Sequence, residues 1–88
     1  MKVQNMIGPR GHAVPNQYHF TDDAGNRYFQ SYSSIIAKIS PSGAVTLDEE
    51  KWDYSVTTGK YRNIFLGESK KETLAKIELG LYKLANLN

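Results

Sequence analysis

The run from Thr57 to Arg62, T-T-G-K-Y-R, combines the side chains of this chain that best suit binding chemistry. Threonine hydroxyls and free backbone amides at a helix N-terminus form an anion site, and the lysine and arginine add positive charge. A tyrosine precedes the run, and Tyr and Arg are residue types that often dominate protein interfaces. We therefore predict a site for phosphate or for an acidic protein surface at Tyr54, Thr57, Thr58, Lys60 and Arg62.

The same run also allows a purely structural interpretation. Thr57 or Thr58 would then only cap a helix, Lys60 would be solvated, and Arg62 would pair with Asp53. The sequence leaves both interpretations open.

Side chains that could carry catalysis or bind a metal are sparse. Catalysis by a nucleophile needs a base oriented by a third group, yet His12 and His19, the two imidazoles, lie in no such motif. Asp22 and Asp23 share one turn, which is too few ligands for a metal. The glycines near the N-terminus do not follow a strand and precede a helix, as a phosphate-binding loop requires. We expect no enzymatic activity, no cofactor and no metal.

Composition indicates one small globular domain over residues 1–88. Hydrophobic residues make up 40% of the chain and charged residues 23%, which is typical of a folded protein. The chain has no cysteine, which excludes disulfides and thiolate metal sites and agrees with a reducing compartment. No run resembles a signal peptide or reaches the ~20 apolar residues of a membrane span. We expect a protein of the cytoplasm without membrane contact.

Charge is unevenly distributed although the net charge is only +2. Residues 48–53 are locally acidic and residues 60–76 locally basic, an asymmetry that can orient a partner or simply mark two solvated faces. A nucleic-acid-binding surface is the alternative to a protein-binding one. It would use Arg10, Lys60, Arg62, Lys70 and Lys71, with exposed tyrosines for stacking.

The first half of the chain predicts an antiparallel meander of about four strands. Alternation over residues 17–21 and 27–32, around a turn at 22–26 with Gly25, predicts a hairpin. Residues 35–39 and 44–47, joined by Ser40-Pro41-Ser42-Gly43, predict two further strands. Residues 1–16 contain glycines and prolines without apolar periodicity, so we expect an extended or mobile arm there.

The second half predicts two short helices that cover the meander. Asp48 would cap a helical turn, and Trp52 would be a core anchor. Thr57 or Thr58 would cap a helix that starts at Gly59 or Lys60 and ends at Leu66, before Gly67. A buried stripe of Tyr61, Ile64 and Phe65 is expected on it, with a strand over residues 60–66 as the alternative.

A second helix follows from a capping box. Ser69 and Glu72 predict its start, and it would run to about Leu79. Leu74, Ile77 and Leu81 would share its buried face, and Glu72 would pair with Lys76. Residues 81–87 predict a last short strand or a packed tail. The fold class is therefore α+β, with a meander covered by two C-terminal helices.

Three segments resemble a family of small proteins of tailed bacteriophages and prophages. They are residues 14–17, residues 28–32 and, most specifically, residues 52–68, with the pattern W-D-Y-S-x-T-T-x-K-Y-R-x-x-F-L. The resemblance covers residues 14–88 and belongs to a domain of unknown function, so it implies no catalytic residue or cofactor. It implies an accessory protein in the bacterial host cytoplasm that binds a host or phage macromolecule. A protein partner, for example a host defence complex that is inhibited, is the first hypothesis, and nucleic acid is the second.

Overall fold

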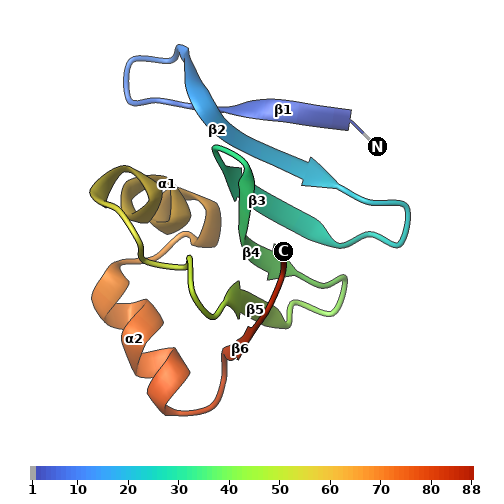
Figure 1. Cartoon of the computed structure of the whole chain (residues 1–88), viewed down its shortest axis with the longest axis vertical. Helices are drawn as coiled ribbons and strands as arrows, with labels where there is room; N and C mark the ends of the chain where they lie inside the picture. Colours follow the sequence, from blue (N-terminus) through green and yellow to red (C-terminus); the bar gives the residue numbers. More distant parts are fainter. Residues whose placement is uncertain (1) are drawn as a thin grey trace.

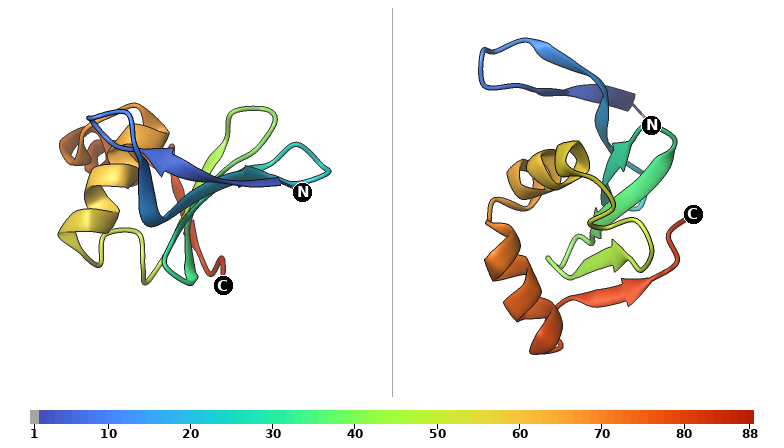
Figure 2. Two further views of the ribbon diagram at one scale, coloured as in Figure 1. Left: turned by 90° about the horizontal axis from the view of Figure 1, so that it is seen from above. Right: turned by 60° about the vertical axis from the view of Figure 1, so that its left-hand side comes forward.

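A six-stranded sheet forms the main layer of the computed structural model, which describes residues 2–88. Its strands lie in chain order, and every neighbouring pair from β1 to β5 is antiparallel. Both helices come between β5 and β6 and lie on one side of the sheet (Figures 1 and 2). The strands are β1 (Lys2–Ile7), β2 (Ala13–Thr21), β3 (Arg27–Ser31), β4 (Ser34–Ile39), β5 (Val45–Asp48) and β6 (Lys83–Ala85), and the helices are α1 (Val56–Leu66) and α2 (Lys70–Glu78).

This arrangement confirms the predicted α+β class, with a larger sheet than the four strands expected. The hairpin of β2 and β3 closes as predicted: Asp22 Oδ1 accepts from the Ala24 and Asn26 amides, and Gly25 has a φ of 89°. The two strands expected after it are β4 and β5, and the short strand expected near the C-terminus is β6.

The segment expected as an extended or mobile arm, residues 1–16, contains paired strands within its described part, residues 2–16. Residues 2–7 form β1, which pairs with β2, and β2 begins at Ala13. A register shift between Asn5 and Ile7 interrupts this pairing, and the extra residues lie on β2, where the partners move from Tyr18 to Ala13. The sequence of β1, K-V-Q-N-M-I, has no period-two apolar pattern that would predict a strand.

The hydrophobic core lies between the centre of the sheet and α1. Phe29, Ile36 and Leu47 of the sheet are completely buried. From α1, Tyr61 and Phe65 pack against them, and the rings of Phe29 and Phe65 stack with centroids 5.8 Å apart. Burial of such aromatic side chains stabilises a small domain from few positions.

The buried face of α1 differs from the predicted stripe in one position. Tyr61 and Phe65 are buried as expected, but Ile64 is exposed. Besides Gly59, the buried residues are Thr58, Tyr61, Arg62 and Phe65, which follow the i, i+3, i+4, i+7 spacing of one helix face. Two of these four side chains are polar, so a search for apolar periodicity selects a face rotated from the real one.

The second helix confirms the capping box, but of the predicted apolar face only Ile77 packs, partly buried, against the core. Ser69 Oγ accepts from the Glu72 amide, and Glu72 accepts from the Ser69 amide. Thr73 is the buried residue of α2, whereas Leu74 is exposed, as is Leu81 beyond the helix end. Because its carboxylate binds Ser69, Glu72 does not pair with Lys76 as predicted.

The segment between β5 and α1 is fixed by a carboxylate and a tryptophan. Asp48 Oδ2 accepts from the amides of Glu50 and Lys51, which confirms the predicted cap. Trp52 packs against the core but stays partly exposed, so it lies at the edge of the core rather than inside it. These contacts hold in place the segment that leads into α1.

Candidate binding cleft

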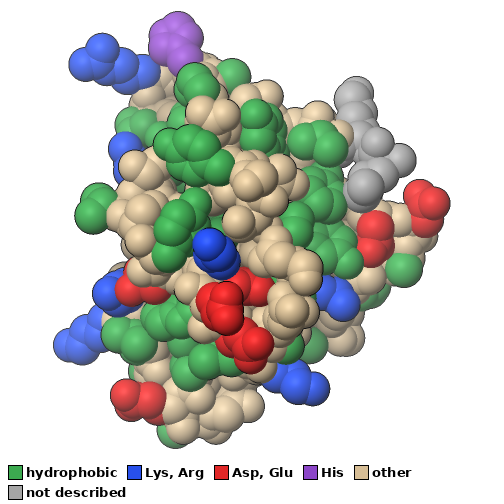
Figure 3. Space-filling model, in the orientation of Figure 1, with side chains coloured by type: hydrophobic (Ala, Val, Ile, Leu, Met, Phe, Trp, Pro, Cys, Tyr) green, Lys and Arg blue, Asp and Glu red, His purple; other side chains and the backbone are tan. Residues whose placement is uncertain are grey.

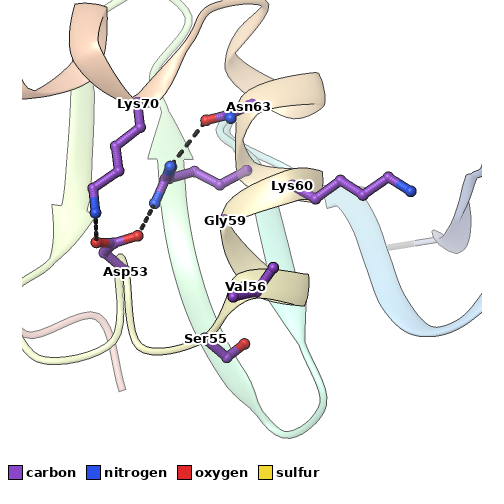
Figure 4. Close-up of a pocket in the computed structure, with 8 residues that line it drawn as sticks. Asp53, Ser55, Val56, Gly59, Lys60, Asn63 and Lys70 are labelled. Carbon is purple, nitrogen blue, oxygen red and sulfur yellow. Dashed lines mark hydrogen bonds and ion pairs between the residues drawn. The ribbon is translucent and has the colours of Figure 1, made fainter.

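A cleft of about 590 Å³ runs along the first turns of α1 and reaches the start of α2 (Figure 4). Its four charged side chains come from three separate segments: Asp53 before α1, Lys60 and Arg62 on α1, and Lys70 on α2. Three of these side chains are cationic and one is anionic. The cleft therefore has a local excess of positive charge beside the predicted T-T-G-K-Y-R run.

The first turn of α1 starts earlier than predicted. Ser55, not Thr57 or Thr58, is the N-cap, and its hydroxyl accepts from the Thr58 amide at 3.1 Å. Ser lies three residues before that amide, which is the spacing that an N-cap side chain needs. No acidic side chain lies in the first turn, so the positive end of the α1 dipole is not neutralised there.

Thr58 is buried and turned away from the cleft. Its hydroxyl lies 2.8 Å from the hydroxyl of Ser31 on β3 and 3.0 Å from that of Ser55. These bonds fasten the start of α1 to the sheet, so Thr58 acts as a structural residue here. Thr57, by contrast, is exposed on the outer face of the helix.

Arg62 is the most important departure from the predicted contact surface, because it is only 1% exposed. Its Nη1 donates to the Trp52 carbonyl and to Asp53 Oδ1, both at 2.9 Å, and its Nη2 donates to Asn63 Oδ1. Its guanidinium lies over the Trp52 ring, 5.1 Å from the centroid. The alternative interpretation, in which Arg62 pairs with Asp53, is confirmed, and Arg62 cannot reach a partner from this position.

The guanidinium is not fully used by these bonds. A guanidinium has five N–H groups, and the three hydrogen bonds above leave the buried Nε without a partner among residues 2–88. Buried polar groups without a partner are uncommon in native proteins. Arg62 therefore keeps one buried N–H group unpaired, although its charge is paired with Asp53.

Asp53 is the single carboxylate of the cleft and is shared by two cations. Its Oδ1 accepts from Arg62, and its Oδ2 lies 2.6 Å from Lys70 Nζ. Partial burial alone would raise the pKa of Asp53, but the hydrogen bonds from Lys70 and Arg62 outweigh it, and the pKa lies below its ordinary value. The side chain is 28% exposed, so solvent and solutes still reach it.

Gly59 explains why this ion pair is open to the cleft. A Cβ at this position would lie 3.6 Å from Arg62 Nη2 and 3.6 Å from Asp53 Oδ1. In Figure 4, Gly59 lies between the ion pair on one side and Lys60 on the other. A Cβ at position 59 would contact both members of the pair at ordinary van der Waals distance, whereas glycine, although buried, adds no side-chain atoms there.

The accessible residues of the site lie around that groove. Lys60 extends away from the ion pair (Figure 4) and has no ion pair among residues 2–88. Val56 is 92% exposed, and Tyr54 is exposed with Lys51 Nζ over its ring at 5.3 Å. The structure thus places Lys60, Thr57 and Tyr54 of the predicted site where a partner can touch them.

The predicted site lacks six residues that line the cleft: Asp53, Ser55, Val56, Gly59, Asn63 and Lys70. Of these, Gly59 was expected only as a helix start, Asp53 only as a partner of Arg62, and Lys70 only as a contact to nucleic acid. A glycine inside a helix, close to residues of opposite charge, is the signal that could have identified position 59, since glycine weakens a helix unless something requires it.

The cations predicted for nucleic acid do not form one surface. Arg62 is buried and Lys70 is bound to Asp53, while exposed Arg10 lies in the turn between β1 and β2. Acidic side chains gather near the centre of Figure 3, over the segment that joins β5 to α1, where Glu49 and Glu50 are exposed. The alternation of charge on this face does not resemble a continuous basic track.

Residues 2–88 contain no group of three or more His, Asp or Glu side chains placed to hold a metal ion. Over the same residues, neither helix has the length and apolar composition needed to cross a membrane. The cleft is a feature of the described chain in which a pocket and several charged side chains coincide.

Comparison with known proteins identified one family. A family model described as "Family of unknown function (DUF8033)" matches residues 1–80. The comparisons with curated proteins and with solved structures found no match.

Proposed function

The chain belongs to the DUF8033 family of unknown function, and from the geometry of the cleft we propose that it is a protein-binding accessory module. Its contact surface is the outer face of α1, with Val56, Lys60 and Tyr54 as accessible residues. In line with the resemblance noted in its sequence, we propose that it is encoded by a phage or prophage. It would act in the bacterial cytoplasm on a host or phage protein, for example by inhibiting a host defence complex.

The observation that carries this proposal is the exposure of Val56. At 92% exposure it is the most exposed of the large hydrophobic side chains, although it stands on a helix whose opposite face is firmly packed. Single exposed apolar residues are ordinary. Here, however, the residue borders a cleft with a free lysine beside it and a tyrosine nearby. An apolar anchor surrounded by polar groups is the usual composition of a protein interface.

Site-specific photocrosslinking tests the proposal. A photoreactive phenylalanine analogue at Val56, in bacterial cells that express the protein, should give one discrete crosslinked adduct. The matched control is the same analogue at Ala24, which is exposed in the turn between β2 and β3. Adducts of equal yield at both positions, or none at Val56, would contradict a contact surface on α1.

A further inference from the structure

The charges around Gly59 identify the chemistry of the partner more closely. We infer that the cleft receives an acidic segment of the partner protein, which crosses α1 over Gly59. One carboxylate of this segment pairs with Lys60, and a second competes with Asp53 for Lys70. This inference rests on the proposed protein-binding function and assigns the chemical class of its ligand.

The charge balance of the cleft favours an acidic ligand. Lys60, Arg62 and Lys70 contribute three positive charges, and Asp53 contributes the one negative charge among the lining residues. Lys60 has no ion pair within residues 2–88, whereas Arg62 and Lys70 both pair with Asp53. A ligand carrying carboxylates therefore meets an uncompensated positive potential at short range.

Lys70 is accessible to a carboxylate of the ligand. Its side chain is 53% exposed, although its Nζ lies only 2.6 Å from Asp53 Oδ2. An exposed ion pair of this kind contributes little to stability, so a lysine can exchange its carboxylate partner at small cost. Asp53 keeps its bond to buried Arg62 during such an exchange, so no carboxylate is left without a partner.

The position of Gly59 suits an extended segment that crosses α1. Lys60 and Lys70 line the cleft on opposite sides of this residue, and the Asp53–Arg62 pair lies between Gly59 and Lys70 (Figure 4). An extended segment laid over Gly59 would place carboxylates at both sides and an apolar side chain on exposed Val56. The positive end of the α1 dipole, which no acidic first-turn residue neutralises, favours the same charge.

Peptide selection provides the experiment. Random 12-residue peptides selected by ribosome display against the immobilised full chain should converge on sequences with two or more Asp or Glu residues and one apolar residue. A synthetic peptide of the selected sequence should shift backbone amide NMR signals over residues 55–63 and at Lys70. Its analogue with Asn and Gln in place of Asp and Glu should bind at least tenfold more weakly.

Variants of the protein locate the charges. Lys60→Ser and Lys70→Ser should each weaken the acidic peptide about tenfold, while the matched control Lys71→Ser, on α2 but outside the cleft, should change affinity less than twofold. Gly59→Ala should also weaken binding about tenfold without lowering the melting temperature, because its methyl group fills the groove but meets its neighbours at ordinary contact distance.

Each contrary result has a distinct meaning. Selected peptides without acidic residues that still shift the α1 signals would overturn the acidic ligand and leave the protein-binding function standing. Peptides that shift only signals elsewhere, or the absence of any selected peptide, would overturn this cleft as a peptide site. A mixed-sequence single-stranded 12-mer DNA that binds Lys60 and Lys70 more tightly than the acidic peptide would assign the site to nucleic acid instead.

Discussion

The two carboxylates that flank α1, Asp53 before it and Glu68 after it, are held in opposite ways. Glu68 is 4% exposed and receives three short bonds, from Thr73 Oγ1 and Lys76 Nζ at 2.6 Å and from Tyr82 Oη at 2.7 Å. Asp53 is 28% exposed, is shared by two cations, and borders a cleft. One carboxylate is sealed and charge-balanced, whereas the other lies in an excess of positive charge.

In this small domain, stability and recognition thus depend on two different carboxylates, Glu68 and Asp53. The sealed carboxylate follows α1 and binds donors from α2 and from the segment before β6, which ties both to the end of α1. The open carboxylate holds Arg62 in place but leaves Lys70 free to exchange. The predictions that follow test whether the two sites differ as their geometry indicates.

Arg62→Ala should have the largest effect on folding. Removing a buried guanidinium deletes its bonds to Trp52 and Asp53 and its packing on the indole ring, and breaking a buried ion pair costs about 3–5 kcal/mol. We expect a loss near the lower limit, about 3 kcal/mol, because Asp53 keeps Lys70. Urea denaturation measures it, with exposed Lys60→Ala as the control, for which a change of ~0.5 kcal/mol or less is expected. Equal losses in the two variants would mean that Arg62 is not a structural residue.

Glu68→Gln should follow, with a loss of about 2 kcal/mol, since hydrogen bonds to charged groups contribute ~1.5–3 kcal/mol. The amide keeps the shape of the side chain but gives up the charge that Lys76 and Tyr82 bind. Glu78→Gln, on an exposed residue at the end of α2, is the matched control. If thermal or urea denaturation finds no difference between the two variants, the sealed site does not stabilise the fold.

Acid should destabilise the protein through both carboxylates. Burial tends to raise the pKa of each, but hydrogen bonds, from Lys70 and Arg62 to Asp53 and from Lys76, Thr73 and Tyr82 to Glu68, hold both below their ordinary values of 3.8 and 4.5. A lowered folded-state pKa means that the stability is fully present above the ordinary value and is lost as pH falls below it. Unfolding free energy measured from pH 6 to pH 2.5 should therefore fall with acid, and less steeply in Asp53→Asn and in Glu68→Gln. A slope unchanged in both variants would show that other groups control the acid transition.

Gly59→Ala should have the smallest effect on folding and the opposite sign. Glycine within a helix costs about 0.5–1 kcal/mol relative to alanine, and the added methyl group would meet no atom closer than 3.6 Å. We expect a gain of up to about 0.5–1 kcal/mol, measured by urea denaturation. A loss of stability would mean that the groove over the Asp53–Arg62 pair is tighter than its geometry indicates.

The sequence predicted most of the sheet because its signals there are local. The turn at Asp22–Asn26 and the alternation around it needed only neighbouring residues to be recognised, as did the Ser69 capping box. β1 was missed because its sequence, K-V-Q-N-M-I, has no period-two apolar pattern, and pairing with β2 supplies the order that its own sequence lacks. Local patterns are informative only where the element is regular.

The site was harder to predict than the fold because it depends on contacts between segments. The T-T-G-K-Y-R run does border a cleft, but its arginine and its second threonine face inward and its lysine faces outward. The direction of these side chains follows from the buried face of α1, which is formed by Thr58, Tyr61, Arg62 and Phe65 at i, i+3, i+4 and i+7. A search for apolar periodicity does not detect this face because two of the four residues are polar. The contribution of Lys70 follows from the packing of α2 beside α1, which no pattern within residues 57–62 contains.

The parallel pairing of β5 with β6 has a consequence for the order of folding. β1 to β5 join through short turns, so their contacts close small loops, whereas β6 reaches β5 only after the chain has passed through both helices. Closing that long crossover costs more chain entropy than any hairpin in the sheet. The last strand should therefore dock late and detach early, which would make exchange of its amide hydrogens the first sign of the native state opening.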